Sequence, residues 1–234
     1  MTAASRPRVI CHMMASVDGR ILTDGWPQSH EGRRQYEVVH ESYEPDAWLC
    51  GRVTMEAHFA QGTRSGAQVA REHDGAPRED FRAPGEHESF AFAVDSSERL
   101  AWDTNDIDGD HVVAILSQRV SDEYLAFLRE RGVSYILAGA REVDLSHALE
   151  KVASRFGVRT LMLEGGGKIN GGMLRAGLVD EVSVLLAPVV DGRMGTPAVF
   201  DFTDDDAPRY RLALDSVERR ADDVLWLRYC VEPW

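Results

Sequence analysis

Short apolar runs recur along the whole chain, each four to eight residues long and bounded by glycine, proline or polar residues. Runs of this length, rich in valine, isoleucine, leucine and alanine, are typical of strands buried on both faces of a sheet. The predicted strands cover residues 8–15, 47–50, 90–94, 111–116, 133–137, 160–163 and 182–188.

Segments with helical spacing lie between these strands. Residues 31–43 place apolar side chains three or four positions apart, and Pro45 ends that helix. Ser121 and Asp144 begin two further helices as N-caps, each with a glycine just beyond the far end. Strands that alternate with capped helices indicate an α/β fold with a mainly parallel central sheet flanked by helices.

Two regions depart from this alternation. Residues 210–214 and 224–229 are apolar runs without a helix between them, and we expect a C-terminal antiparallel hairpin there. Residues 61–89 show no periodicity and are too long for an ordinary connection, which predicts a polar loop or insertion that is either a functional flap or partly disordered. No linker or repeat interrupts the chain, so we expect a single domain over residues 1–234.

Charge and composition narrow the class of function. The net charge of −13 argues against nucleic acid or an anionic membrane as the main partner. No apolar run approaches the roughly 18 residues of a membrane span, and residues 1–8 do not resemble a signal peptide. We therefore expect a soluble, cytoplasmic protein. Its three cysteines are far apart within or beside apolar segments, which favours buried thiols over a disulfide framework or a metal site.

The aromatic and histidine side chains give little further chemistry. His12 lies within an apolar strand and is expected to be a core residue, and Trp26 and Trp48 are expected to pack. His30, His40 and His58 could border a cleft, but their spacing does not indicate a metal site. We therefore expect no bound metal.

The stretch from Glu164 to Gly172 is the densest cluster of candidate chemistry. It reads Glu-Gly-Gly-Gly-Lys-Ile-Asn-Gly-Gly, follows the predicted strand 160–163, and leads into an apolar segment at 173–178. Consecutive glycines let backbone amides approach a ligand, and a helix start just downstream favours an anion. The simpler interpretation is a flexible loop that needs only tight turns. The strand before it, the carboxylate at the strand exit and Lys168 favour a phosphate-binding turn.

Other small or polar residues follow predicted strands in the same way. They are Ala15 to Asp18, Gly51 to Thr54, Asp95 and Ser96, and Ser117. Because ligands of open α/β sheets gather at the carboxyl ends of the strands, we expect these residues to line one cleft with the glycine turn.

These motifs together resemble the reductase domain of riboflavin biosynthesis (the RibD C-terminal type), which has a dihydrofolate-reductase-like fold. The resemblance rests on Ser16-Val17-Asp18-Gly19-Arg20-Ile21, Gly51-Arg52-Val53-Thr54, Val94-Asp95-Ser96 and the run from Leu163 to Gly192. It covers nearly the whole chain, and the last run is its most specific part.

The resemblance implies a homodimeric, NADPH-dependent enzyme that reduces a ribosylamino-pyrimidine phosphate to its ribitylamino form, by hydride transfer to the sugar C1′. Asp18 and Glu164 become the candidate catalytic residues, and Ser16, Asp18 and Glu164 the candidate substrate-binding residues. Either carboxylate would stabilise positive charge or relay a proton. Ser96, Ser117 and Arg119 are the candidate contacts for the 2′-phosphate. The predicted cofactor-binding residues are Ala15, Thr54, Ser96, Gly165, Gly166, Gly167, Lys168, Ile169, Asn170 and Gly171.

The chain departs from that family where the substrate phosphate would bind. A helix arginine expected there aligns near Ser42, and residues 55–59 replace the usual Asp-Asp-Pro segment. Loop arginines, such as Arg64, Arg71, Arg78 or Arg82, are possible substitutes. Two alternatives therefore stay open: the same fold and cofactor acting on a pterin, a folate or another small carbonyl or imine compound, or an inactive nucleotide-binding module.

Overall fold

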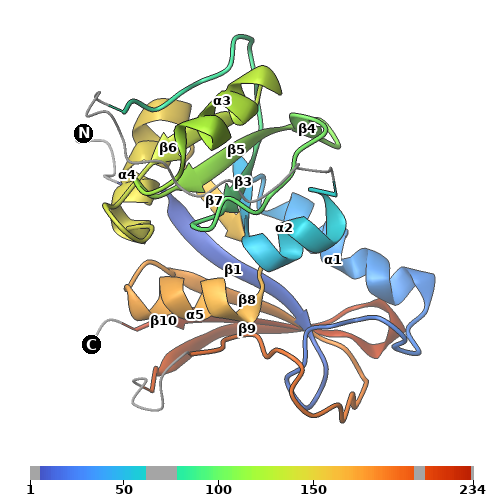
Figure 1. Ribbon diagram of the computed structural model, residues 1–234. Helices are drawn as coiled ribbons and strands as arrows, with labels where there is room; N and C mark the ends of the chain where they lie inside the picture. Colours follow the sequence, from blue (N-terminus) through green and yellow to red (C-terminus); the bar gives the residue numbers. More distant parts are fainter. Residues whose placement is uncertain (1–5, 62–77, 203–208, 233–234) are drawn as a thin grey trace. The chain divides into compact units, whose positions relative to one another are not determined.

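The computed structural model describes residues 6–61, 78–202 and 209–232 (Figure 1). The chain forms two compact units. The first comprises Met1–Pro7 and Asp46–Arg159, and the second comprises Arg8–Pro45 and Thr160–Trp234. The second unit is therefore built from both ends of the chain, with the first unit inserted in sequence between its halves. A single domain over residues 1–234 remains a prediction.

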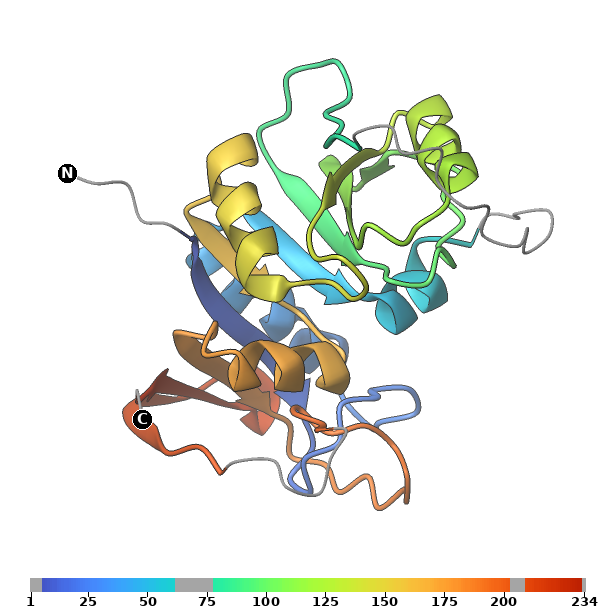
Figure 2. The same ribbon diagram turned by 60° about the vertical axis from the view of Figure 1, so that its left-hand side comes forward.

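The first unit is a parallel sheet with helices. Its strands β2 (Ala47–Gly51), β3 (Phe90–Val94), β5 (Asp110–Leu116) and β6 (Ser134–Leu137) pair in parallel in that order, and the short β4 (Asp106–Ile107) pairs antiparallel with β5. The helices are α2 (Arg52–His58), α3 (Asp122–Glu130) and α4 (Leu145–Phe156). Figure 2 shows α4 lying across the strands, where its Phe156 ring packs edge-on against Phe90 and Phe92.

The predicted helix caps of this unit are confirmed. The Ser121 side chain accepts a hydrogen bond from the Tyr124 amide, and the Asp144 side chain accepts one from the His147 amide. Gly157 ends α4 in the left-handed conformation, with φ of 75°. These local signals fixed the helix boundaries because each satisfies backbone groups that a helix end leaves without partners.

Residues 80–83 lie along β6, and we call them the edge strap. The Phe81 and Tyr135 backbones exchange hydrogen bonds of 2.9 and 2.8 Å. The Asp80 carboxylate accepts hydrogen bonds from the Leu137 amide and from the Lys151 ammonium group, both at 2.9 Å. This part of the predicted polar loop is therefore a built element of the first unit. Residues 62–77, with Arg64 and Arg71, lie outside the described part of the chain.

The second unit is a mixed sheet. Strands β7 (Thr160–Leu163), β1 (Arg8–Ala15) and β8 (Glu181–Leu186) pair in parallel in that order, and β10 (Leu225–Val231) and β9 (Leu212–Arg219) continue the sheet antiparallel (Figure 1). Helix α1 (His30–Ser42) covers one face, where Val39 packs with Met14, Leu185 and Trp226. The short helix η1 (Ala221–Asp223) precedes β10, and α5 (Gly167–Arg175) follows β7.

The predicted fold class is confirmed in both units: strands and helices alternate, most pairs are parallel, and a C-terminal antiparallel hairpin is present. The helix after β7 begins earlier than the sequence predicts. We expected a glycine turn followed by a helix from residue 173, but α5 already begins at Gly167. The sequence did not predict this start because glycine has a low helix propensity. Tertiary packing overrides that propensity here.

Candidate functional site

The first turn of α5 follows the end of β7 after three residues. Gly166 is its N-cap, and no side chain caps the helix. Gly165 has φ of 95° and is joined to Gly166 by a cis peptide bond. The positive φ favours glycine at this position, and a Cβ on Gly165 would in addition lie 3.1 Å from the end of the Met13 side chain. Uncapped first-turn amides at the positive end of a helix form a site that suits a phosphate.

Packing, rather than ligand access, explains the later glycines of this stretch. A Cβ on Gly167 would lie 2.3 Å from the Ala198 carbonyl oxygen, and one on Gly171 would lie 2.3 Å from that of Asp201. The buried Asn170 side chain donates a 2.9 Å hydrogen bond to the Val199 carbonyl. The segment 198–201 therefore lies directly against α5, and the close approach needs residues without side chains.

Because α5 is helical from its start, only some of the amides predicted to bind the cofactor lie at the N-terminal end of the helix. Those of Ile169 and Asn170 donate to the Gly166 carbonyl, and Gly171 lies inside the helix. The amides of Gly166, Gly167 and Lys168 are the ones at the helix end. The exposed Lys168 side chain stands on the same turn.

Glu164 is the first residue after β7 and lies on the face of the sheet that α1 covers. Leu163 pairs with Cys11, so the next residue along β7 comes level with His12. The Glu164 carboxylate Oε1 lies 2.7 Å from Nδ1 of His40, in the last turn of α1. Only 12% of the Glu164 side chain and 19% of the His40 side chain are exposed. From the sequence, His40 was expected only to border a cleft, and its pairing with Glu164 was not predicted because the two residues are far apart in the chain.

His12 is a core residue, as expected. One of its ring nitrogens lies 3.2 Å from the Tyr36 carbonyl, which can only accept, so Nε2 carries the proton. Nδ1 then accepts from the Ser183 hydroxyl at 3.1 Å, and that oxygen in turn accepts from the Trp226 indole at 2.8 Å. Burial lowers the pKa of His12, so the ring is neutral near pH 7.

Asp18 holds two loops of the second unit together. Its carboxylate accepts hydrogen bonds from the Ser16 hydroxyl at 2.7 Å and from the Asp191 and Gly192 amides at 2.9 Å. The Asp191 amide, followed by the Ser16 hydroxyl, lowers the pKa of Asp18 to about 2. An aspartate ionised at neutral pH stabilises positive charge but does not donate a proton. This limits the role predicted for Asp18.

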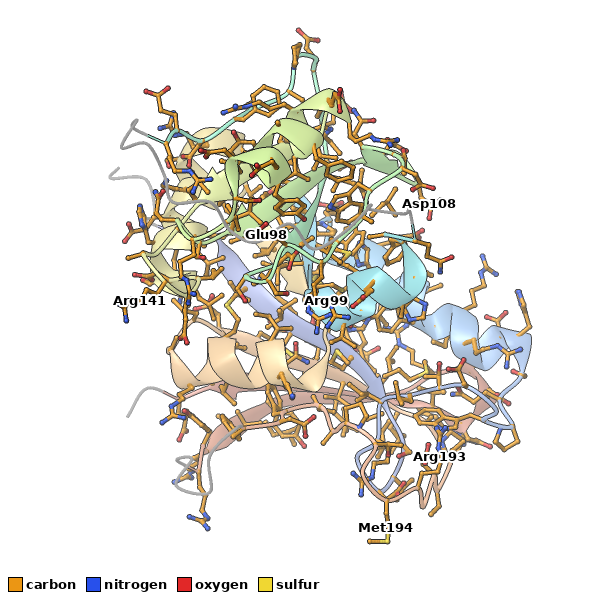
Figure 3. All side chains as sticks on the ribbon, in the orientation of Figure 1. Glu98, Arg99, Asp108, Arg141, Arg193 and Met194 are labelled. Carbon is orange, nitrogen blue, oxygen red and sulfur yellow. The ribbon has the colours of Figure 1, made fainter. Side chains whose placement is uncertain are left out.

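The other candidate residues near Asp18 are Ala15 and Ser16, at the end of β1. Ala15 is the last residue of the strand, its carbonyl accepts from the Ala187 amide, and Ser16 is buried at the turn. Trp26 packs as expected, with its indole donating a 2.7 Å hydrogen bond to Asp191. Arg193 also binds the Asp191 carboxylate and is labelled with the exposed Met194 in Figure 3.

Thr54 and Ser96 belong to the first unit. Thr54 lies half-buried in α2, and Ser96 is exposed directly after β3. The neighbouring Asp95 is buried and accepts hydrogen bonds from the Ser97, Arg99 and Leu100 amides and from the Tyr124 hydroxyl. It therefore fixes the loop that carries Ser96, Glu98 and Arg99 (Figure 3). Arg99 lies 3.2 Å from Glu56 of α2.

Ser117 and Arg119 follow β5 in the same unit. The Ser117 side chain is buried, and its hydroxyl accepts a weak 3.4 Å hydrogen bond from the Arg119 amide. Binding of a cofactor by any of these first-unit residues stays a prediction. Within residues 6–61, 78–202 and 209–232, no helix is long and apolar enough to cross a membrane. Over the same ranges, no three histidine, cysteine or carboxylate side chains gather as a metal site.

Comparison with known proteins defines the class. Residues 7–226 match the RibD C-terminal domain family, and the chain belongs to that family. Membership implies a nicotinamide cofactor.

Individual relatives are similar over almost their whole length. The 2,5-diamino-6-ribosylamino-4(3H)-pyrimidinone 5′-phosphate reductase of Methanothermobacter thermautotrophicus is 31% identical, over 94% of this chain and 96% of its own. The reductase of the same name from Archaeoglobus fulgidus is 27% identical, over 84% and 87%.

Solved structures share the fold over nearly the whole chain. A pyrimidine reductase-like protein from Corynebacterium diphtheriae has a TM-score of 0.71 at 18% identity, covering 97% of this chain and 92% of that one. The riboflavin biosynthesis reductase Rib7 of Saccharomyces cerevisiae has a TM-score of 0.65 at 14% identity, covering 99% and 93%. The resemblance stated from the motifs is therefore confirmed at the level of family and fold.

Proposed function

We propose that the protein is a cytoplasmic, NADPH-dependent reductase of riboflavin biosynthesis, converting a ribosylamino-pyrimidine phosphate into its ribitylamino form. The observation that carries this proposal is the uncapped start of α5 two glycines after Glu164, which sets an anion site beside a carboxylate in a RibD-family chain. Because the two relatives described above are named for the 2,5-diamino-pyrimidinone substrate, we propose that base rather than its deaminated uracil counterpart.

The residues fit a dinucleotide phosphate. The amides of Gly166, Gly167 and Lys168 would hold the pyrophosphate, with the Lys168 side chain as an added cation. Ala15, Thr54 and Ser96 would border the rest of the cofactor, and Ser96, Ser117 and Arg119 would bind the 2′-phosphate that distinguishes NADPH from NADH.

When bound, the nicotinamide supplies a hydride to the sugar C1′. The chain then has to align the two carbons and stabilise the cationic imine that forms when the sugar ring opens. Glu164 would hydrogen-bond the substrate, and the ionised Asp18 would add negative charge on the substrate side. Neither role requires a nucleophile.

One observation favours a different acceptor. Where the family places a phosphate-binding arginine, the Ser42 hydroxyl donates a 2.6 Å hydrogen bond to the Val39 carbonyl in the same helix. That hydroxyl is engaged within α1 and does not replace an arginine. The second candidate is therefore a reductase with the same cofactor acting on a pterin, a folate or another small imine or carbonyl compound without a phosphate.

Cofactor titration followed by turnover tests both candidates. We expect NADPH to bind at micromolar concentration and the diaminopyrimidinone phosphate to be reduced faster than the uracil analogue. Glu164→Gln should lower kcat while leaving NADPH affinity near the wild-type value. NADPH binding without reduction of either pyrimidine phosphate would favour the second candidate. Failure to bind NADPH or NADH would leave the inactive nucleotide-binding module.

We also propose a homodimer of single-domain chains, and one sheet face supports the dimer. The register of β8, β10 and β9 places apolar side chains on the face opposite α1. Leu214 and Val217 on the edge strand β9 are 57% and 51% exposed. A contiguous apolar face of this kind marks a protein contact, and we assign a second copy of the chain to it. The face comprises Val184, Leu186, Leu214, Val217, Leu225, Leu227 and Tyr229.

A further inference from the structure

The contact between His40 and Glu164 joins two elements that the sequence separates by 124 residues. A carboxylate can only accept a hydrogen bond, so His40 Nδ1 carries a proton whatever the charge of the ring. Both side chains are largely buried, which strengthens the interaction relative to water. The pair therefore holds a proton at the end of β7.

Two titratable neighbours on β1, Cys11 and His12, do not compete for this proton. Both residues lie close enough to Glu164 to interact with its charge. Burial raises the pKa of the Cys11 thiol and lowers that of the His12 ring, so both are neutral near pH 7. The His12 nitrogens are also occupied by Tyr36 and Ser183. His40, by contrast, stands at the negative end of the α1 dipole and beside a carboxylate, and both favour its protonated form.

We propose that His40 is a positioning residue that orients Glu164 and stores the proton which the reduction consumes. This proposal rests on the proposed function. The C1′–O4′ bond breaks with its electron pair moving to O4′, and C1′ accepts the hydride, so the sugar carbon is reduced and the nicotinamide oxidised. O4′ then needs one proton. His40 passes its proton to the Glu164 carboxylate, Glu164 delivers it to O4′, and solvent reprotonates His40.

His40→Gln separates orientation from proton storage. Glutamine keeps an N–H donor for Glu164 Oε1 but does not titrate. We expect kcat at neutral pH to fall about 100-fold, the typical value of a lost acid–base group, and the pH dependence of kcat to lose one ionisation. NADPH affinity and the melting temperature should stay near wild type. His147→Gln, at an exposed position of α4, is the matched control and should behave as wild type.

A second measurement does not depend on turnover. NMR titration of the His40 ring in wild type and in Glu164→Gln should show its midpoint lowered by about one pH unit when the carboxylate is removed. An unchanged midpoint would overturn the pair. A shifted midpoint with wild-type kcat and pH profile in His40→Gln would overturn the catalytic role. Wild-type protein that binds NADPH but reduces no pyrimidine phosphate would instead refute the proposed substrate, and with it the proton delivery to O4′.

Discussion

The Asp18 carboxylate is held in place mainly by backbone amides. Three donors from two loops converge on it, and they keep it ionised far below neutral pH. The same arrangement makes Asp18 a structural link as well as a candidate charge near the substrate. Its two roles can be separated, because loop order and turnover are measured independently.

We predict that Asp18→Ala loosens the loop after β8. The Asp191 and Gly192 amides lose their acceptor, so their hydrogen exchange should speed up by about an order of magnitude. Hydrogen-exchange mass spectrometry of that loop measures this. Asp24→Ala, an exposed aspartate of the other loop, is the control and should leave the two amides protected. Unchanged exchange in Asp18→Ala would show that other contacts hold the loop.

His111 makes stability depend on pH. The residue is 2% exposed, its ring stacks on that of His87 with the ring centres 3.8 Å apart, and its Nε2 lies 2.7 Å from the Ser134 hydroxyl. Burial, then His87 and Arg82, lower the pKa of His111 to about 4. The unfolded ring takes up a proton below about pH 6.5 while the folded ring does not. The free energy of unfolding should therefore fall between about pH 6.5 and pH 4, by up to about 3 kcal/mol from this residue.

Urea unfolding of wild type and His111→Gln at pH 7.5 and pH 4.5 measures this contribution. The wild type should lose more stability on acidification than His111→Gln does. His147→Gln, which removes an exposed histidine, should follow the wild type. Equal losses in wild type and His111→Gln would mean that the folded His111 ring titrates normally.

At the level of elements, α5 reverses the usual effect of a helical glycine. Replacing glycine by alanine in an open helix stabilises it by about 1 kcal/mol. Gly171→Ala should instead destabilise the protein by about 2–3 kcal/mol, because its Cβ would meet the Asp201 backbone oxygen, which cannot rotate away. Gly32→Ala in α1 is the matched control. Its Cβ would lie 2.5 Å from Asp222 Oδ2 and 3.0 Å from Asp222 Cβ. This side chain can move if it gives up its hydrogen bond from the Ser29 amide, so the loss should be smaller than at Gly171.

Chemical denaturation of both variants measures the difference. A neutral or stabilising Gly171→Ala would show that the segment 198–201 yields easily. It would also restore the possibility that these glycines serve ligand access rather than packing.

The elements that sequence predicts well are those specified locally. Ser121 and Asp144 cap their helices through side-chain contacts with residues three positions away, and apolar runs of the right length defined the strands. The edge strap and the His40–Glu164 pair were missed because they depend on contacts between distant segments, such as Phe81 with Tyr135. The start of α5 was missed because its stabilising partner, segment 198–201, lies about 30 residues downstream.

For the whole molecule, the prediction concerns assembly. The apolar face of β8, β10 and β9 should bury itself in a dimer, so the native mass should be twice the 26.1 kDa of one chain. Leu214→Glu combined with Val217→Glu should yield monomers, because two buried like charges in each copy would be unpaired. Light scattering after size exclusion measures the mass. Glu218→Gln, on the other face of β9, is the control and should remain dimeric.

A monomeric wild type would contradict the proposal that a second copy of the chain covers this face. A dimer that persists in the double variant would place the interface elsewhere on the chain. The net charge of −13 adds a condition: repulsion between two acidic copies is screened by salt, so dissociation should increase as ionic strength falls.

The edge strap affects how readily the protein aggregates in the cell. β6 carries the sequence Ser-Tyr-Ile-Leu, and all four residues are buried. A strand of that composition with an open edge is a template for strands of other chains. By pairing its own backbone with Tyr135, Phe81 occupies part of that edge. Loss of the strap should therefore appear first as aggregation during expression, before any loss of activity in the protein that remains in solution.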